Sequence, residues 1–351
     1  MSMEAADLLF TEKEFQLRTQ AAMDWIRRSI DVHGGKGSAA YFSFGKWAPA
    51  YPETTGYLIE TLLEYHLKTY ARSCGQWLLE VQHADGSFPS RYANSGRPSI
   101  FNTGMILFGL TRLFEESKEE AYRKALSRAV GWLLAELAPD GSWPGHAFVP
   151  GFIPSYYTRA VWGLLRANQV LKDPNVDPDM RKAMDYYARR IQPDGTVRDW
   201  GFHPGKPAFT HTIAYTWRGF WEAGLLLEQE EWLSAVQRGM ENLAALRQKH
   251  NRLPGSLDEQ GRGDFSFSCL AGNVQLSLLS GRIYQHTKEA RYLIMAQDFF
   301  RETAVRQVLR PKSSYNGGIA GSHPLWGSYQ RMRYPNWAVK FFLDAYLQLK
   351  R

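Results

Sequence analysis

The residue whose type and position point most directly to chemistry is Glu53, in the segment Tyr51-Pro52-Glu53. Proline suits the first position of a helix, where its missing N–H costs nothing, so we expect a helix that begins at Pro52. Glu53 would then lie in the first turn of that helix. A carboxyl in this position either transfers protons in a site or only complements the positive end of the helix dipole, and the sequence leaves both readings open.

Two further carboxylates stand shortly before predicted helices. Asp264 precedes a helix expected near Ser268, and Asp199 precedes one expected near Thr210. Either of them, paired with Glu53, would supply the two carboxyl groups that glycoside hydrolysis requires, about 5 to 9.5 Å apart. Aspartates in loops and at helix caps are also common structural residues, and that alternative stays open for both.

A histidine and an arginine suggest a second kind of chemistry. His211 and Arg218 are seven residues apart and therefore on one face of a predicted helix. His211 would act as a base, and Arg218 would clamp a carboxylate. With Tyr215 and Tyr334 they would serve the β-elimination or C5 epimerisation of a uronate. The alternative for His211 is a buried, hydrogen-bonded structural residue.

A further set of residues has the chemistry to hold a saccharide. Aromatic side chains suit the faces of sugar rings, and basic side chains suit carboxylates. The candidates are Trp47, Tyr51, Tyr157, Arg159, Tyr215, Arg218, Trp326, Arg333, Tyr334 and Asn336. A third hypothesis needs only such residues: a non-catalytic module that binds polysaccharide. We favour an enzyme because acids, histidines and tyrosines occur together with the aromatic residues.

Six internal repeats must position these side chains. Each repeat holds an amphipathic helix, a loop of about fifteen to twenty residues and a second, less charged helix. Glycines inside the second helices, such as Gly104 and Gly109, indicate close helix packing. We therefore predict an all-α fold, an (α/α)6 barrel of six hairpins, with the second helices inside and the long loops on one rim. The chain is expected to be one domain, 1–351, with repeats at 13–69, 70–119, 120–173, 180–229, 231–288 and 290–351.

Three of the long loops contain an Asp-Gly turn, at Asp85, Asp140 and Asp194. Aspartate bonds to nearby amides and glycine supplies a positive φ, so both favour turns. Their repetition indicates a structural role for these three aspartates rather than a catalytic one.

The composition argues against several classes of protein. The formal net charge is +7, but Lys and Arg form no run, so a nucleic-acid groove is not expected. Two cysteines give no disulfide framework, and no metal-ligand spacing occurs, so we expect no metal or other cofactor. No stretch approaches the roughly 20 apolar residues of a membrane span, and residues 1–7 show no apolar leader. We expect a cytoplasmic protein whose histidine-rich, mildly basic rim binds an acidic oligo- or polysaccharide.

Two segments carry a family resemblance: YPETTGY at 51–57 and YPNWAVKFFLDA at 334–345. They resemble bacterial exopolysaccharide-cluster proteins of the VpsJ type. Over almost its whole length the chain is similar to the toroid superfamily that includes terpenoid cyclases, protein prenyltransferases and glucuronyl C5-epimerases. The resemblance implies a role in making or trimming an acidic or complex polysaccharide. The chain lacks the Asp-x-Asp-Asp acid of terpene cyclases, and Asp264 and Cys269 are spaced differently from the zinc ligands of prenyltransferases.

Overall fold

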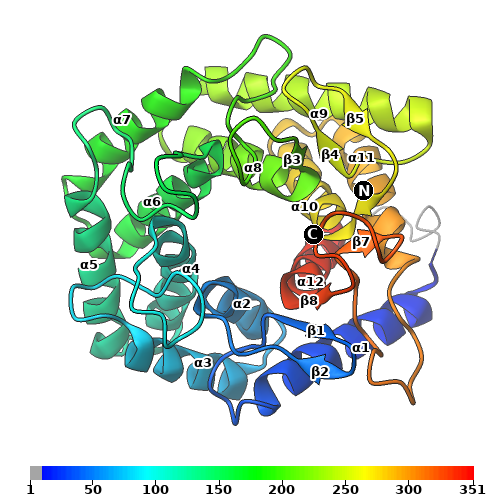
Figure 1. Ribbon diagram of the computed structural model, residues 1–351, viewed down its shortest axis with the longest axis horizontal. Helices are drawn as coiled ribbons and strands as arrows, with labels where there is room; N and C mark the ends of the chain where they lie inside the picture. The colour runs from blue at the N-terminus through cyan, green and yellow to red at the C-terminus, as the bar shows by residue number, and fades with distance from the viewer. Residues whose placement is uncertain (1–9) are drawn as a thin grey trace.

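The computed structural model describes residues 10–351, and within them twelve α-helices form two concentric rings (Figure 1). The outer helices are α1 (Glu12–Asp31), α3 (Lys68–Val81), α5 (Glu120–Ala135), α7 (Val176–Ala188), α9 (Glu230–His250) and α11 (Ala290–Ala304). The inner helices are α2 (Pro52–Glu64), α4 (Ile100–Ser117), α6 (Thr158–Leu171), α8 (Thr210–Leu226), α10 (Leu270–Thr287) and α12 (Asn336–Lys350). The first helix of each hairpin is outside and the second is inside, as predicted from the sequence.

The ring is closed between its first and last hairpins. Helix α12 contacts α2, and β1 (Tyr41–Ser43) pairs with β8 (Tyr334–Pro335) in the register Phe42↔Tyr334. The indole Nε1 of Trp25 on α1 donates to Asn336 Oδ1 at the start of α12, at 2.8 Å. These contacts join the two ends of the repeat, so the predicted all-α (α/α)6 barrel is confirmed.

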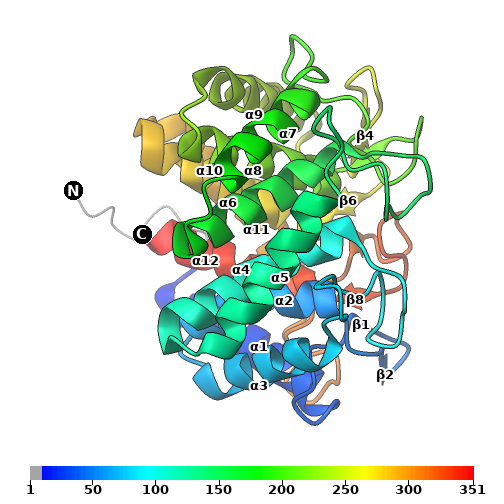
Figure 2. The same ribbon diagram turned by 90° about the vertical axis from the view of Figure 1, so that its left-hand side faces the viewer.

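The long loops and short strands lie at one end of the barrel, where the inner helices begin (Figure 2). One sheet has the order β2-β1-β8 and another the order β3-β4-β5, while β6 and β7 form a pair. The remaining strands are β2 (Lys46–Trp47), β3 (Ala208–Phe209), β4 (Ser256–Leu257), β5 (Gly263–Asp264), β6 (Ser268–Cys269) and β7 (Ser322–His323). Each sheet ties loops of neighbouring hairpins together, which fixes the rim.

Glycines on the inner helices allow the close packing that the sequence indicated. A Cβ placed on Gly109 of α4 would lie 2.1 Å from the carbonyl oxygen of Gly56 on α2. A Cβ on Gly163 of α6 would lie 2.4 Å from the carbonyl oxygen of Gly104 on α4. Backbone meets backbone at these positions, so a larger residue would force the inner helices apart.

We expect Gly109→Ala to lower the free energy of unfolding by about 1–3 kcal/mol, because overpacking must shift two helix backbones. Gly131, on outer helix α5, is the matched control, since a Cβ there would meet nothing within 4 Å. Gly131→Ala should raise stability by up to about 1 kcal/mol through helix propensity alone. Denaturant titration of both variants measures the difference. Equal effects would contradict the packing argument.

The Asp-Gly turns have the structural role that their repetition suggested. Asp85 Oδ1 accepts from the amide and the hydroxyl of Ser87 at 2.9 and 2.7 Å. Asp140 makes the same two contacts with Ser142, at 2.9 and 2.7 Å. The intervening Gly86 has a φ of +100°, which favours glycine. These carboxylates therefore hold the chain in a turn.

No helix within residues 10–351 combines the length and apolarity needed to cross a membrane. The N-terminal residues 1–7, on which the expectation of a missing leader was based, lie outside the described part of the chain.

Candidate functional site

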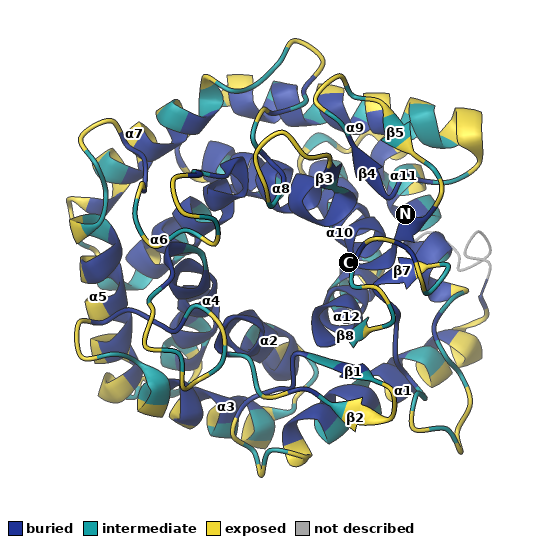
Figure 3. Cartoon of the chain, viewed as in Figure 1, coloured by how far each residue is buried: buried dark blue, intermediate teal, exposed yellow. Residues whose placement is uncertain are grey.

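A cavity of about 830 Å³ opens at the rim, where the inner helices begin. In Figure 3 the inner helices around it are almost entirely buried, and the exposed residues gather on the loops above and on the outer helices. Five of the residues singled out in the sequence line this cavity: Tyr51, Glu53, Tyr157, His211 and Tyr215. They come from three inner helices and the residues just before them, so the fold brings together side chains that are far apart in the sequence.

Glu53 is the one Asp or Glu that lines the cavity in the described chain. It lies in the first turn of α2, behind Pro52, as predicted, and its side chain is buried. Burial raises the pKa of Glu53 to about 7, while the Tyr51 phenol and the Arg159 guanidinium oppose that rise. A carboxyl with this pKa can both donate and accept a proton near neutral pH.

Three phenol groups surround Glu53. Burial and the charge of Glu53 raise the pKa of Tyr51 well above its usual range. Tyr57 lies one turn further along α2, next to Tyr215 of α8. The hydroxyls of Tyr57 and Tyr215 are buried and lie close to each other, but their mutual contact lacks good hydrogen-bond geometry and neither has another partner in the described chain. A buried hydroxyl without a hydrogen-bond partner destabilises the folded chain unless water or a ligand supplies that partner. Both hydroxyls are therefore well placed to bind saccharide hydroxyls.

His211 presents a proton donor to the cavity rather than a base. Gln275 Nε2 donates to the carbonyl of Ala271 at 3.0 Å and contacts His211 Nδ1 at 2.7 Å. Because the amide nitrogen is the donor, Nδ1 accepts and the imidazole proton lies on Nε2. Burial, together with the charge of Arg159, lowers the pKa of His211 to about 3. The ring is therefore neutral at physiological pH, and the base role predicted for it does not fit this tautomer.

Arg159 lies under the cavity and is 5% exposed. Its guanidinium carbon is 4.5 Å from the ring centroid of Tyr215 and 5.2 Å from that of Trp162. No ion pair or hydrogen bond connects its guanidinium to any residue in 10–351. Cation–π contacts thus hold an unpaired positive charge beside Glu53 and His211, where it favours anionic groups. Arg159 does not itself line the cavity, so it lies outside the position needed for the direct substrate contact predicted from the sequence.

Aromatic side chains form the cavity walls. Phe101 packs edge-on against Tyr156 at 5.0 Å between ring centroids, and Tyr329 lies 5.0 Å from the His211 ring. Phe148, in the loop before α6, is 62% exposed and stands above the cavity. Flat apolar surfaces of this kind suit the faces of sugar rings. The sequence analysis missed Phe101, Phe148 and Tyr329 because aromatic residues are frequent along the whole chain.

The two carboxylates predicted to partner Glu53 lie elsewhere. Asp264 is exposed on β5, and its Oδ1 accepts from the amide of Ser266 at 2.8 Å. Asp199 adopts a φ of +58° and lies 3.6 Å from Arg190. Both stabilise loops, and neither lines the cavity. The carboxylate pair expected for glycoside hydrolysis is therefore absent from the cavity lining of the described chain.

Arg218 also lies away from the cavity, although it shares a helix face with His211. Seven residues along a helix correspond to about 10 Å, so Arg218 is deeper in the barrel. Its Nε is 2.7 Å from Glu222 Oε1, an ion-pair contact without good hydrogen-bond angles. Glu222 also accepts two hydrogen bonds from Arg282 of α10, at 3.0 and 3.1 Å. Glu222 therefore already compensates the charge of Arg218. This corrects the prediction that Arg218 clamps the carboxylate of a substrate.

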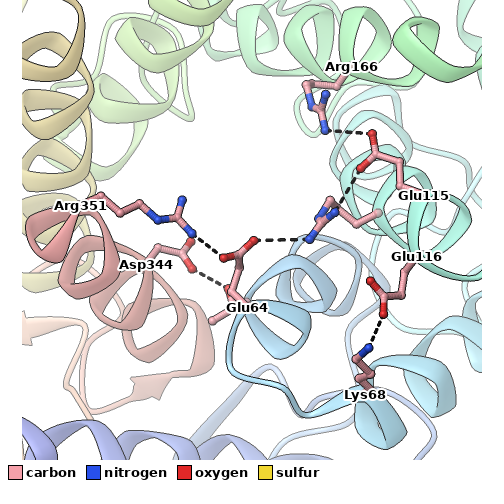
Figure 4. A network of polar contacts seen from close by, with 9 residues as sticks. Glu64, Lys68, Glu115, Glu116, Arg166, Asp344 and Arg351 are labelled. Carbon is pink, nitrogen blue, oxygen red and sulfur yellow. Dashed lines mark hydrogen bonds and ion pairs between the residues drawn. The ribbon is translucent and has the colours of Figure 1, made fainter.

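Similar pairs link the other inner helices below the cavity (Figure 4). Glu115 of α4 pairs with Arg166 of α6 at 3.5 Å, and Arg112 of α4 pairs with Glu64 of α2 at 3.4 Å. The Thr61 hydroxyl of α2 donates to Asp344 of α12 at 2.6 Å. We call the whole set the lumen ion network: Glu64, Arg112, Glu115, Arg166, Arg218, Glu222, Arg282, Lys340, Asp344 and Arg351.

Three predicted substrate-binding residues instead stabilise the seam of the ring. Asn336 Nδ2 donates to Ser38 Oγ at 2.8 Å, besides accepting from Trp25. Trp47 packs against Trp25, with 4.7 Å between ring centroids, and Tyr334 lies 5.0 Å from Tyr315. None of the three lines the cavity.

Trp326 and Arg333 lie on the rim outside the cavity. Trp326 is 66% exposed, in the loop between β7 and β8. The Arg333 guanidinium carbon is 4.3 Å from the centroid of the Tyr41 ring. Both remain accessible to a ligand that extends beyond the cavity. Throughout residues 10–351, no three His, Cys, Asp or Glu side chains are grouped so as to hold a metal ion.

Comparison with known proteins shows what the chain resembles. No protein-family model matches it, and no curated protein matches its sequence. Its structure is similar to an unsaturated glucuronyl hydrolase specific for heparin, with a TM-score of 0.74, 14% identity and 97% of each chain covered. It is also similar to cellobiose 2-epimerase from Spirochaeta thermophila, with a TM-score of 0.73, 16% identity and coverage of 96% of this chain and 97% of that one. A polysaccharide lyase matches with a TM-score of 0.67 and 10% identity, over 97% of this chain and 98% of the other. At these identities the likeness establishes the fold.

Proposed function

We propose that this protein is a carbohydrate-active hydrolase that opens an unsaturated uronyl group at the end of an acidic oligosaccharide. The observation that carries the proposal is that, within residues 10–351, one carboxyl lines the cavity, that of Glu53, with a pKa of about 7. Hydrolysis of an ordinary glycosidic bond uses two carboxyl groups. A sugar with a C4=C5 double bond is an enol ether, and its opening needs only one proton donor.

The reaction follows from that chemistry. The Glu53 carboxyl donates its proton to C4, and the ring oxygen stabilises the positive charge that develops at C5. Water adds to C5 and returns a proton to Glu53, which gives a hemiketal. The hemiketal opens to a ketone, and the hemiacetal left at C1 releases the rest of the saccharide. One water is consumed, and Glu53 ends in the state in which it began.

Other groups of the site would bind the sugar during this reaction. The Nε2–H of His211 and the hydroxyls of Tyr57 and Tyr215 are available donors. Arg159 adds positive potential beneath them, which favours the carboxylate of a uronate. The fold is shared with an unsaturated glucuronyl hydrolase, which supports the reaction class. The cytoplasmic location and the polysaccharide-cluster role expected from the sequence remain part of this proposal.

A second reaction class is favoured by the two tyrosines. Burial raises the pKa of Tyr57 and Tyr215, so both phenols stay protonated and can act only as acids. Glu53 as base and a tyrosine as acid would together move protons in β-elimination or C5 epimerisation of a saturated uronate.

One assay separates these reactions. The purified protein is incubated with unsaturated uronyl disaccharides and, separately, with saturated polyuronates and glycosaminoglycans. We expect the ultraviolet absorbance of the conjugated double bond to disappear from the disaccharides, with two products whose masses add up to that of the disaccharide plus one water. Absorbance that appears from the saturated polymers would instead establish elimination, and solvent deuterium at C5 without cleavage would establish epimerisation. Binding without any product would support the non-catalytic module.

A further inference from the structure

We propose that three arginines beside the cavity mouth bind anionic groups on the sugars that follow the terminal one. These residues are Arg91, Arg97 and Arg333, and we call them the arginine edge. The inference rests on the proposed function for the position of the terminal sugar. It specifies the substrate class further, as a polyanionic oligosaccharide with charge on at least one sugar outside the cavity.

The arginine edge is continuous with the cavity. Arg91 and Arg97 lie in the loop between α3 and α4, and both line the cavity. The hydrogen bond from the Ser90 amide to the Arg97 carbonyl, at 2.8 Å, fixes that loop. Arg333 Nη1 lies 3.4 Å from Oε1 of Gln330, which is itself a cavity residue. A saccharide that leaves the mouth on this side therefore meets all three arginines.

Three tyrosine rings lie beside the arginine edge. The rings of Tyr51 and Tyr92 are 6.3 Å apart, and Tyr51 lines the cavity. Burial and Tyr41 raise the pKa of Tyr92, while Arg91 and Arg333 lower it, so Tyr92 lies within the influence of both arginines. Arg333 in turn covers the ring of Tyr41. Tyr51, Tyr92 and Tyr41 thus form an aromatic surface flanked by positive charge, which suits sugars that carry anionic substituents.

The charges of the arginine edge are uncompensated. All three arginines are exposed, and none forms an ion pair with any residue from 10 to 351. In the loop between α9 and α10, by contrast, Arg262 pairs with Asp258 at 2.7 Å, and Asp264 adds another negative charge. A planar guanidinium that has no protein carboxylate to bind is well suited to a sulfate or carboxylate. The asymmetry of charge indicates the side on which the chain leaves.

The test measures equilibrium binding, which does not depend on turnover. Saturated tetrasaccharides from heparin and from hyaluronan, together with neutral cellotetraose, are titrated calorimetrically into wild type, Arg333→Gln and Arg97→Gln. Arg123→Gln is the matched control, because Arg123 is an exposed arginine on outer helix α5. We expect each edge variant to bind at least one anionic tetrasaccharide about tenfold more weakly, the effect of one lost charge-assisted hydrogen bond.

The pattern across probes decides the outcome. If the edge variants lose affinity only for the heparin fragment, the bound group is a sulfate. If they also lose affinity for the hyaluronan fragment, the arginines bind carboxylates too. The control variant and cellotetraose should show no change in affinity. Equal affinities in wild type and both edge variants would overturn the proposal, as would a wild type that binds none of the anionic probes. Because no catalysis is involved, failure of the hydrolase proposal would appear separately, in the absorbance assay.

Discussion

Replacing Glu53 with glutamine is expected to lower kcat by about 10²- to 10⁴-fold, the usual contribution of a positioned acid or base. Glutamine keeps the size of the side chain and replaces the ionisable carboxyl with an amide that does not titrate near neutral pH. The wild-type rate should fall as pH rises through about 7, because burial raises the pKa of Glu53 to that value and only the protonated form is the acid. Steady-state kinetics across this pH range tests both statements.

The matched control for this prediction is Asp264→Asn. Asp264 is an exposed carboxylate of the rim that lies outside the cavity, so its loss should leave kcat and the pH profile unchanged. A Glu53→Gln protein that retains most of its activity would remove Glu53 from the mechanism. A pH profile without a decline near 7 would argue that another group supplies the proton.

The same variant should gain stability at alkaline pH. The pKa of Glu53 is about 7 in the folded chain, against an ordinary value of 4.5. A group whose pKa is raised by folding contributes its full stability below the ordinary pKa, and loses it as pH rises through the folded one. Above pH 7 the buried carboxylate therefore destabilises the wild type by roughly 3 kcal/mol, a cost that glutamine avoids. Thermal unfolding at pH 4 and pH 8 should show equal stability at the lower pH and a more stable variant at the higher one.

Glu222→Gln is expected to lower the free energy of unfolding by about 3–5 kcal/mol, because it leaves two arginines without their counter-charge. The side chains of Arg218 and Glu222 are 13% and 8% exposed, and Arg282 contacts the same carboxylate. Burial alone would raise the pKa of Glu222, but Arg218 and Arg282 outweigh it and lower the pKa. The stability this group contributes is thus present above its ordinary pKa and lost as pH falls through the folded one.

Denaturant unfolding at neutral pH measures the effect, with Glu80→Gln as the control. Glu80 pairs with Lys36 at 3.3 Å, but both side chains are more than half exposed, so its loss should cost less than about 1 kcal/mol. Similar losses in the two variants would mean that solvent reaches the lumen ion network and screens it.

The fold could be predicted from the sequence because it depends on features repeated six times. Gly104 and Gly109 lie inside a predicted helix, which indicated close helix packing and placed that helix in the inner ring. The structure confirms this, because both glycines face the backbone of a neighbouring inner helix. Glu53 could be placed at the rim because Pro52 fixed the start of its helix. Whether it is catalytic is still a prediction.

The rest of the site depends on geometry that periodicity does not contain. His211 and Arg218 share a helix face, yet His211 lies at the cavity and Arg218 in the lumen ion network. Helical spacing predicts which residues share a face, but not how far along the barrel axis each one lies from the rim. The tautomer of His211 is set by Gln275, which is 64 residues away in the chain. Asp199 and Asp264 lie in loops whose direction is decided by local hydrogen bonds. Sequence spacing could not separate these loop residues from cavity residues.

The lumen ion network has a consequence for the way a polymer would be consumed. No member of the lumen ion network lines the cavity, and its ion pairs link neighbouring inner helices further along the barrel. If these paired charges close the lumen, a polysaccharide would not thread through the barrel, and only a chain terminus would reach Glu53. The cleaved sugar must back out through the same mouth before another terminus enters. Degradation would then be distributive, with a rate that follows the number of chain ends and not the number of internal linkages.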